Sequence, residues 1–228
     1  RARAVGFLMA LYQRRLASST HALHQSLQNR ARRLEERLAN AQKLAALAPP
    51  DVPEWEELEE MEEAERERFE ELLDAITMAD NAADIRREVA ELRELAGQAQ
   101  EVEDAECEAK LGKLKDLLQS EGFFDDRSQR LLIFTEFRDT LDYLLERLRK
   151  WGFVVGCIHG GMNAGSREEP GTRLYVEQQF RDGTIQVLVA TEAAGEGINL
   201  QVCNILFNYD IPWNPNRLEQ RMGRIHRY

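Results

Sequence analysis

The chain has 228 residues, of which 31% are charged and 43% hydrophobic, and its formal net charge at neutral pH is −11. This composition is globular, and since no run of about twenty apolar residues occurs, the sequence excludes a membrane-spanning helix. The charge does not exclude a nucleic-acid partner, because the acidity belongs to residues 49–120, which carry 24 acidic and 8 basic side chains.

The two ends of the sequence and its cysteines bear on the kind of protein. The chain begins with Arg1, has no signal peptide and stops inside a charged helical pattern, so we expect a fragment of a longer protein. Cys107, Cys157 and Cys203 are widely spaced and lack the partners of a metal site. We therefore expect reduced thiols, a cytoplasmic protein and no metal site.

Residues 1–121 are predicted to form an all-α region, either a helical hairpin or a small bundle, because helix breakers are rare outside the proline cluster at 49–53. Apolar residues at spacings of three and four predict a helix from Leu27 to Ala48. Further helices are predicted at 54–78, 85–99 and 111–118. A long exposed coiled coil is the alternative, disfavoured because alanine fills many seam positions.

The charged stretches of this helical half are best explained as surface. Eleven glutamates occur between Glu54 and Glu71, and arginines cluster at 14–15 and 30–37. A solvated face, or pairing of these arginines with the acidic helix, is favoured over contact with phosphates.

From residue 122 onward, short apolar runs alternate with amphipathic helices, which predicts an α/β domain with a parallel sheet over residues 122–228. The predicted strands cover 131–134, 153–158, 185–190 and 205–209. Helices are predicted around 141–148, at 172–181, and in an arginine-rich stretch at 216–227. In such a sheet, ligands bind at the carboxyl ends of the strands.

Two glycine-containing loops follow predicted strands at that edge: His159-Gly160-Gly161, and the segment from Thr191 to Asn199. Glycine lets a backbone turn or approach a phosphate, and threonine supplies a hydroxyl donor. A tight turn would also explain either loop taken alone. Their occurrence on one sheet edge favours phosphate contact.

The arginine-rich helix places Gln220, Arg224 and Arg227 on one face and Arg217 and Arg221 on a neighbouring stripe. Like charges at this spacing repel, which favours an anion between them over a solvated helix end. No Gly-x-x-x-x-Gly-Lys-Ser/Thr loop occurs, so the chain cannot cradle a nucleoside triphosphate unaided. The arginines therefore suggest fingers that complete the site of another domain.

The sequence resembles a known family in five stretches. Four stretches, in order, are similar to the motifs of the C-terminal RecA-like lobe of superfamily 2 helicases: Leu131 to Phe137, Ile158 to Met162, Val189 to Leu200 and Gln220 to Arg227. The stretch Asp210-Ile211-Pro212-Trp213-Asn214-Pro215 resembles Swi/Snf-like ATPases, and the Gln-Arg-x-Gly-Arg form resembles their bacterial members. The helical half resembles the insert between lobes in these proteins.

The resemblance implies a set of site residues. Arg224 and Arg227 would be the catalytic fingers that reach ATP across the cleft between lobes. Nucleotide contacts would come from Gln220, Arg221, Gly195 and Glu196. Nucleic-acid contacts would come from Thr191, Gly197, Asn199, His159 and Gly160. ATP and Mg²⁺ would be held mainly by a first RecA-like lobe that this sequence lacks, so the fragment, cut off at Tyr228, is expected to be inactive alone.

The sequence therefore predicts the C-terminal motor lobe of an ATP-dependent, Swi/Snf-like DNA translocase. Its expected partners are double-stranded DNA, the first lobe of the same protein and a protein partner for the helical region. One alternative is a non-catalytic interaction module with a degenerate helicase lobe, which the intact arginine motif disfavours. Another is an RNA-directed helicase, which Trp213-Asn214-Pro215 disfavours.

Overall fold

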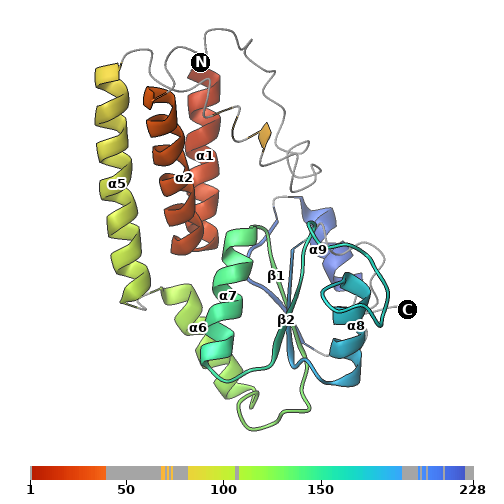
Figure 1. Cartoon of the computed structure of the whole chain (residues 1–228). Coiled ribbons are helices and arrows are strands. Elements are labelled where there is room, and N and C mark those ends of the chain that lie inside the picture. Colours follow the sequence, from red (N-terminus) through yellow and green to blue (C-terminus); the bar gives the residue numbers. More distant parts are fainter. Residues whose placement is uncertain are drawn as a thin grey trace. The chain divides into compact units, whose positions relative to one another are not determined.

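The computed structural model describes residues 2–39, 68–69, 71, 73, 82–105, 108–191, 200, 202–203, 205–212 and 214–223. The helix predicted at 54–78 lies almost entirely outside these residues. The chain divides into two compact units, Arg1–Glu108 and Ala109–Tyr228 (Figure 1). None of the helices in the described part of the chain combines the length and apolar character that a membrane crossing needs.

The first unit contains three described helices, which confirms the predicted all-α region. They are α1 (Ala2–Ser18), α2 (Thr20–Ala39) and α5 (Ala82–Asp104). The chain turns between α1 and α2 at Ser19, whose buried hydroxyl accepts a hydrogen bond of 3.0 Å from the backbone N–H of Ala22. This cap satisfies one of the free donors at the start of α2.

The predicted apolar stripe of α2 packs against α5. Leu27, Ala31 and Leu34 form one buried cluster with Ile85, Val89, Leu92 and Ala96. Ion pairs flank this contact: the Arg30 guanidinium lies 2.7 Å from Glu88, and Arg93 of α5 reaches Glu35 of α2 at 2.6 Å. Of the clustered arginines, Arg30 thus pairs with a glutamate of α5, while the acidic stretch at 54–67 lies outside the described residues.

The second unit is an α/β domain, as predicted. Its helices are α6 (Ala109–Ser120), α7 (Arg138–Lys150), α8 (Arg173–Asp182) and α9 (Pro215–Gly223). Its strands are β1 (Leu131–Thr135), β2 (Val155–Ile158), β3 (Val187–Thr191) and β4 (Ile205–Asn208). The sheet order is β2-β3-β1-β4, and every pairing is parallel.

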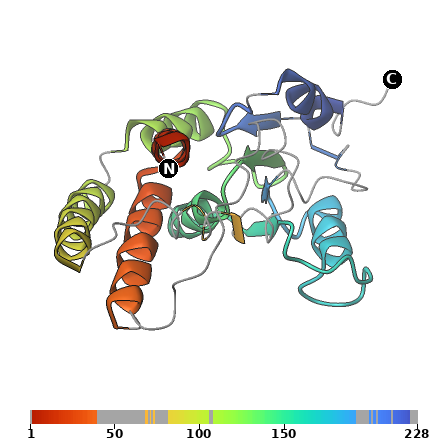
Figure 2. The same cartoon turned by 90° about the horizontal axis from the view of Figure 1, so that it is seen from above.

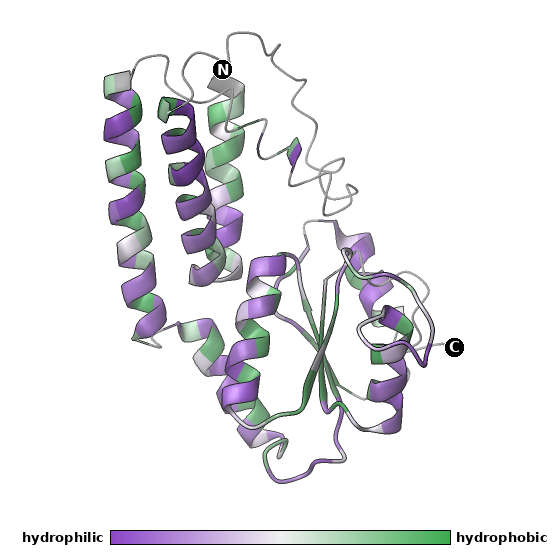
Figure 3. Ribbon diagram, in the orientation of Figure 1, coloured by the Kyte–Doolittle hydropathy of each residue, from purple (hydrophilic) through white to green (hydrophobic). Residues whose placement is uncertain are grey.

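Helices cover both faces of this sheet, with α6 and α7 on one side and α8 and α9 on the other (Figure 2). Alternate residues of β1 face opposite ways: Leu131 and Ile133 join the core under α6 and α7, whereas Leu132 and Phe134 join the core that contains Phe180 of α8. Figure 3 shows hydrophobic residues along the strands and hydrophilic residues on the outer faces of the helices. Burial on two faces explains the continuous apolar strands of the sequence.

The unit boundary lies earlier than the sequence suggested. We predicted a helical region up to residue 121, but the second compact unit begins at Ala109 and includes α6. The reason is packing, because Leu111, Leu114 and Leu118 of α6 are buried in the same core as Leu141 and Leu144 of α7.

The two cysteines with described side chains are free thiols. Burial raises the pKa of Cys203 to about 11 and also raises the pKa of Cys157. Both therefore carry their protons at neutral pH, which makes them poor nucleophiles.

Candidate functional site at the carboxyl edge of the sheet

His159, Thr191 and Asp210 lie where the strands end. Because all four strands are parallel, their carboxyl ends lie at one edge of the sheet. His159 follows β2, Thr191 ends β3, and Asp210 follows β4 within two residues. The edge therefore brings together residues from three separate motifs.

His159 is held as a neutral ring. Its side chain is buried, and its Nδ1 accepts hydrogen bonds from the Gly161 backbone N–H at 3.1 Å and from the Arg138 guanidinium at 2.8 Å. Burial first, and Arg138 second, lower the pKa of His159 below its usual value. With Nδ1 accepting, the proton of the neutral ring sits on Nε2, which acts as a donor.

The loop after His159 is fixed by an arginine that sequence reasoning missed. Arg173, the first residue of α8, donates to the carbonyl of Met162 at 2.8 Å and to that of Gly160 at 2.7 Å. These two hydrogen bonds restrain the backbone of the loop. A conformation set in advance lowers the entropic cost of binding. The sequence signal was weak, because Arg173 lies a dozen residues beyond the motif it holds.

Thr191 has an unusual environment for a buried polar side chain. It is 4% exposed, and its hydroxyl oxygen has no hydrogen-bond partner among the described residues. A buried hydroxyl without a partner is costly, so such groups in folded proteins usually serve a purpose. Together with the backbone amides and the imidazole of the His159 loop, Thr191 adds a donor of the kind that contacts phosphate oxygens.

Asp210 joins three elements at this edge. Its carboxylate accepts from the Thr135 hydroxyl at 2.5 Å and from the Glu136 backbone N–H at 3.0 Å. Its other oxygen lies 2.7 Å from the Lys110 ammonium of α6, which also stacks on the Tyr209 ring. Sequence reasoning used Asp210 only as a family mark and did not predict these contacts.

Arg221 has structural partners in this fold. It is 2% exposed, donates to the Asn208 side chain at 2.8 Å and to the Asp210 carbonyl at 2.7 Å, and lies over the Phe134 ring. These contacts fasten α9 to the end of β4. The nucleotide contact of Arg221 stays a prediction. In the described structure its guanidinium bonds to oxygens of Asn208 and Asp210 within the lobe.

The stretch before α9 contains a helix start. The side chain of Asn214 accepts from the Asn216 backbone N–H at 3.0 Å, and Pro215 is the first residue of the helix. Asparagine at the cap and proline at the first position both favour helix initiation. Helix initiation therefore explains the presence of Asn214 and Pro215 in the Trp-Asn-Pro stretch.

The structure describes two of the remaining predicted residues, Gln220 and Gly160. Gln220 lies on α9 and is exposed, opposite in character to its buried neighbour Arg221. Gly160 lies in the loop held by Arg173. Six predicted residues fall outside the described part of the chain: Gly195, Glu196, Gly197, Asn199, Arg224 and Arg227.

The α/β unit coincides with a known family model. The model of the helicase conserved C-terminal domain matches residues 109–228, the same span as the second compact unit. The sheet and its motif loops all lie within this match.

Similar proteins include both bacterial and eukaryotic helicases. The chain is 51% identical over 98 residues to the uncharacterized ATP-dependent helicase YqhH of Bacillus subtilis, an alignment that covers 43% of this chain and 16% of YqhH. It is 33% identical over 97 residues to the ATP-dependent RNA helicase eIF4A of Botryotinia fuckeliana, covering 42% of this chain and 23% of the relative. Among solved structures, the yeast DEAD-box splicing factor Prp28 is 24% identical, with a TM-score of 0.42, covering 51% of this chain and 23% of that one.

Proposed function

The chain belongs to the helicase conserved C-terminal domain family, within superfamily 2, and from this premise we propose that its α/β unit is the second motor lobe of an ATP-dependent, Swi/Snf-like DNA translocase. The observation that carries the proposal is the carboxyl edge of the sheet. Three motif segments, at His159, at Thr191 and at Asp210 with α9, meet there inside the family match.

The proposed role in catalysis is to complete a site on another lobe. The sequence has no P-loop, so ATP and Mg²⁺ belong to the first RecA-like lobe of the same protein. Arg224 and Arg227 follow α9 in sequence and would stabilise the charge that develops on the γ-phosphate, with Gln220, Gly195 and Glu196 nearby. The contacts of Arg221 support this role, because Arg221 fastens α9, which contains Gln220 and directly precedes Arg224 and Arg227 in sequence.

The proposed role in translocation is to hold one strand of nucleic acid by its phosphates. His159 and Gly160 offer a preorganised loop, and Thr191 offers a hydroxyl that no described residue satisfies. Gly197 and Asn199 continue from Thr191 in the same motif. Closing the lobes on ATP and reopening them after hydrolysis would then shift this grip along the strand.

The choice of double-stranded DNA rests on the stretch from Asp210 to Pro215. This stretch resembles Swi/Snf-like ATPases in sequence. In this chain its Asp210 accepts a hydrogen bond from Thr135 at the end of β1, and Asn214 caps α9. The eIF4A relative makes an RNA-directed helicase the second candidate. Hydrolysis by the full-length protein in the presence of duplex DNA, single-stranded DNA or RNA distinguishes them: we expect the strongest stimulation from duplex DNA, and stronger stimulation by RNA would favour the second candidate.

Arginine substitutions in the full-length protein test the finger assignment. We expect Arg224→Ala or Arg227→Ala to lower DNA-stimulated hydrolysis by about 10³-fold or more, with DNA affinity nearly unchanged. Arg181→Ala, an exposed arginine at the end of α8, is the matched control and should hydrolyse normally. Near-normal turnover in both finger variants would refute the assignment, and a full-length protein without any stimulated hydrolysis would favour the non-catalytic module.

A further inference from the structure

A cluster of histidine and carboxylate side chains lies in the helical unit, far in sequence from the helicase motifs. His21 and His24 are one turn apart on α2, and Glu103 is near the end of α5. One ligand atom from each residue lies within 4.8 Å of the other two. Sequence reasoning looked for metal ligands around the cysteines and missed this group, although the His-x-x-His spacing was visible.

Two of the three side chains already touch. The His21 Nδ1 lies 3.1 Å from both carboxylate oxygens of Glu103, and the side chain of Glu103 is 11% exposed. A histidine–carboxylate pair of this kind would need no further ligand. The pair explains His21 and Glu103 but leaves the third residue unexplained.

His24 is the residue that points to a missing ligand. It is 5% exposed, and its Nδ1 has no hydrogen-bond partner within the part of the chain that the structure describes. That atom lies 3.9 Å from the Glu103 Oε2, beyond hydrogen-bond distance. A buried nitrogen without a partner is energetically costly, and a cation between His24 and Glu103 would satisfy it.

We propose that His21, His24 and Glu103 bind a divalent zinc ion that joins α2 to α5. Two imidazole nitrogens and one carboxylate oxygen are a ligand set that zinc takes, leaving a fourth position for water. Zinc bonds of about 2.0–2.1 Å place tetrahedral ligand atoms a little over 3 Å apart. The His21–Glu103 distance already meets this, and only His24 must move closer.

The surroundings of His24 suit this role. Its Nε2 lies 2.8 Å from the Gln28 side-chain nitrogen, and since the two ends of an amide are exchanged by a half-turn, the Gln28 carbonyl can accept from Nε2–H. A hydrogen bond at Nε2 would fix the tautomer in which Nδ1 is free to bind metal. Burial, the largest effect, lowers the pKa of His24, which keeps the ring neutral at pH 7.

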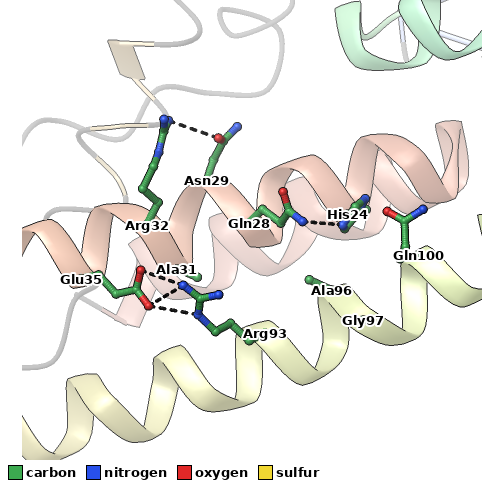
Figure 4. Close-up of a pocket in the computed structure, with 10 residues that line it drawn as sticks. All are labelled: His24, Gln28, Asn29, Ala31, Arg32, Glu35, Arg93, Ala96, Gly97 and Gln100. Carbon is green, nitrogen blue, oxygen red and sulfur yellow. Dashed lines mark hydrogen bonds and ion pairs between the residues drawn. The ribbon is translucent and has the colours of Figure 1, made fainter.

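A cavity gives the site a connection to its surroundings. His24 lines a cavity of about 540 Å³ between α2 and α5. Figure 4 shows His24 and Gln28 at one end of this cavity and the Glu35–Arg93 pair at the other. Of the three proposed ligands, His24 is the one that lines this cavity.

Zinc titration of the chelator-treated chain tests the proposal. Calorimetry with Zn²⁺ should show one equivalent bound, and saturating Zn²⁺ should raise the melting temperature of the helical unit. His24→Gln and Glu103→Gln should weaken Zn²⁺ binding by at least about tenfold, because each removes a ligand. Glu101→Gln changes an exposed carboxylate on the same helix and should bind Zn²⁺ as the wild type does.

Two further measurements keep the test decisive if a buried variant misfolds. His21→Asn alters the most exposed of the three ligands and should also weaken binding. Co²⁺ bound to the wild-type chain should give the visible bands of a tetrahedral nitrogen and oxygen site, without thiolate charge transfer. Absence of Zn²⁺ binding, equal binding by the ligand variants, or a thiolate signal from Co²⁺ would each overturn the proposal.

Discussion

Two threonines occupy matching positions at the ends of neighbouring strands but have opposite surroundings. Thr135 of β1 and Thr191 of β3 are register partners. The Thr135 hydroxyl donates to Asp210 at 2.5 Å, whereas the Thr191 hydroxyl has no partner among the residues described. The first hydroxyl therefore has a partner within the fold, and a contact of the second with a phosphate stays a prediction.

Replacing each threonine with valine, which substitutes a methyl group for the hydroxyl, separates these roles. Thr135→Val should destabilise the α/β unit by about 1.5–3 kcal/mol, because a bond to a charged group is lost. Thr191→Val should leave stability unchanged or raise it, because it removes a buried hydroxyl that has no partner among the described residues. In the full-length protein Thr191→Val should weaken DNA stimulation and leave basal hydrolysis unchanged. Chemical denaturation and ATPase assays measure both, and an unaltered DNA dependence would remove Thr191 from the strand site.

At the residue scale, local sequence patterns predicted which candidate residues follow the strands but not the contacts among them. The positions of His159 and Thr191 at strand ends followed from the apolar runs that precede them. Asp210 was not recognised as the partner of Thr135, because 75 residues separate them. Helical spacing predicted that Gln220 and Arg221 lie on different faces of their helix, but not which face is buried. In the structure the buried residue is Arg221.

In the loop between β2 and α8, the start of α8 depends on the backbone conformation of Gly165. Gly165 has a φ of +58°, and a Cβ added there would overlap the Thr172 side chain. Thr172 caps α8, accepting from the Tyr175 backbone N–H at 3.4 Å, and its hydroxyl lies 2.9 Å from the carbonyls of Ser166 and Glu169. Close packing at Gly165 thus sets the start of the helix that carries Arg173.

Alanine substitutions at two glycines of this loop test that dependence. Gly171 also has a positive φ, of +85°, but no described atom lies within 4 Å of an added Cβ. Gly171→Ala should cost about 1–2 kcal/mol from backbone strain alone. Gly165→Ala should cost at least about 1 kcal/mol more, because Thr172 must also move. Equilibrium denaturation compares them, and equal losses would show that the contact with Thr172 is unimportant.

At the element scale, the predicted helices and strands that fall on described residues occur where expected and differ mainly at their ends. The strand predicted from Phe153 begins at Val155, because Gly152 at φ +88° and the Phe153 N–H bond to the Leu148 carbonyl still belong to the end of α7. An apolar residue that packs beneath a helix end is indistinguishable in sequence from the first residue of a buried strand.

At the scale of the whole molecule, α6 shows what periodicity cannot decide. Its leucine spacing predicted a helix correctly but not the core that the helix joins. Leu111, Leu114 and Leu118 are buried with the sheet, and Lys110 pairs with Asp210. The helix therefore belongs to the α/β unit, in agreement with the family match from residue 109.

Two fragments test this assignment. The fragment 109–228 should fold cooperatively, while 122–228 should not, because it loses three leucines whose burial contributes about 1.5–3 kcal/mol each, comparable in sum with the stability of a small domain. Circular dichroism and thermal melting distinguish these outcomes. A cooperative transition of similar midpoint in both fragments would move the boundary back to residue 121.

The carboxylate of Asp210 also sets an order of events during synthesis. It binds Lys110, made 100 residues earlier, and Thr135, made 75 residues earlier. Contacts so distant along the chain are slow to form, and these two cannot form until residue 210 has emerged from the ribosome. The contacts of Asp210 with β1 and α6 thus wait until residue 210 has been made, so the proposed strand-binding edge is completed only after the three preceding strands have been synthesised.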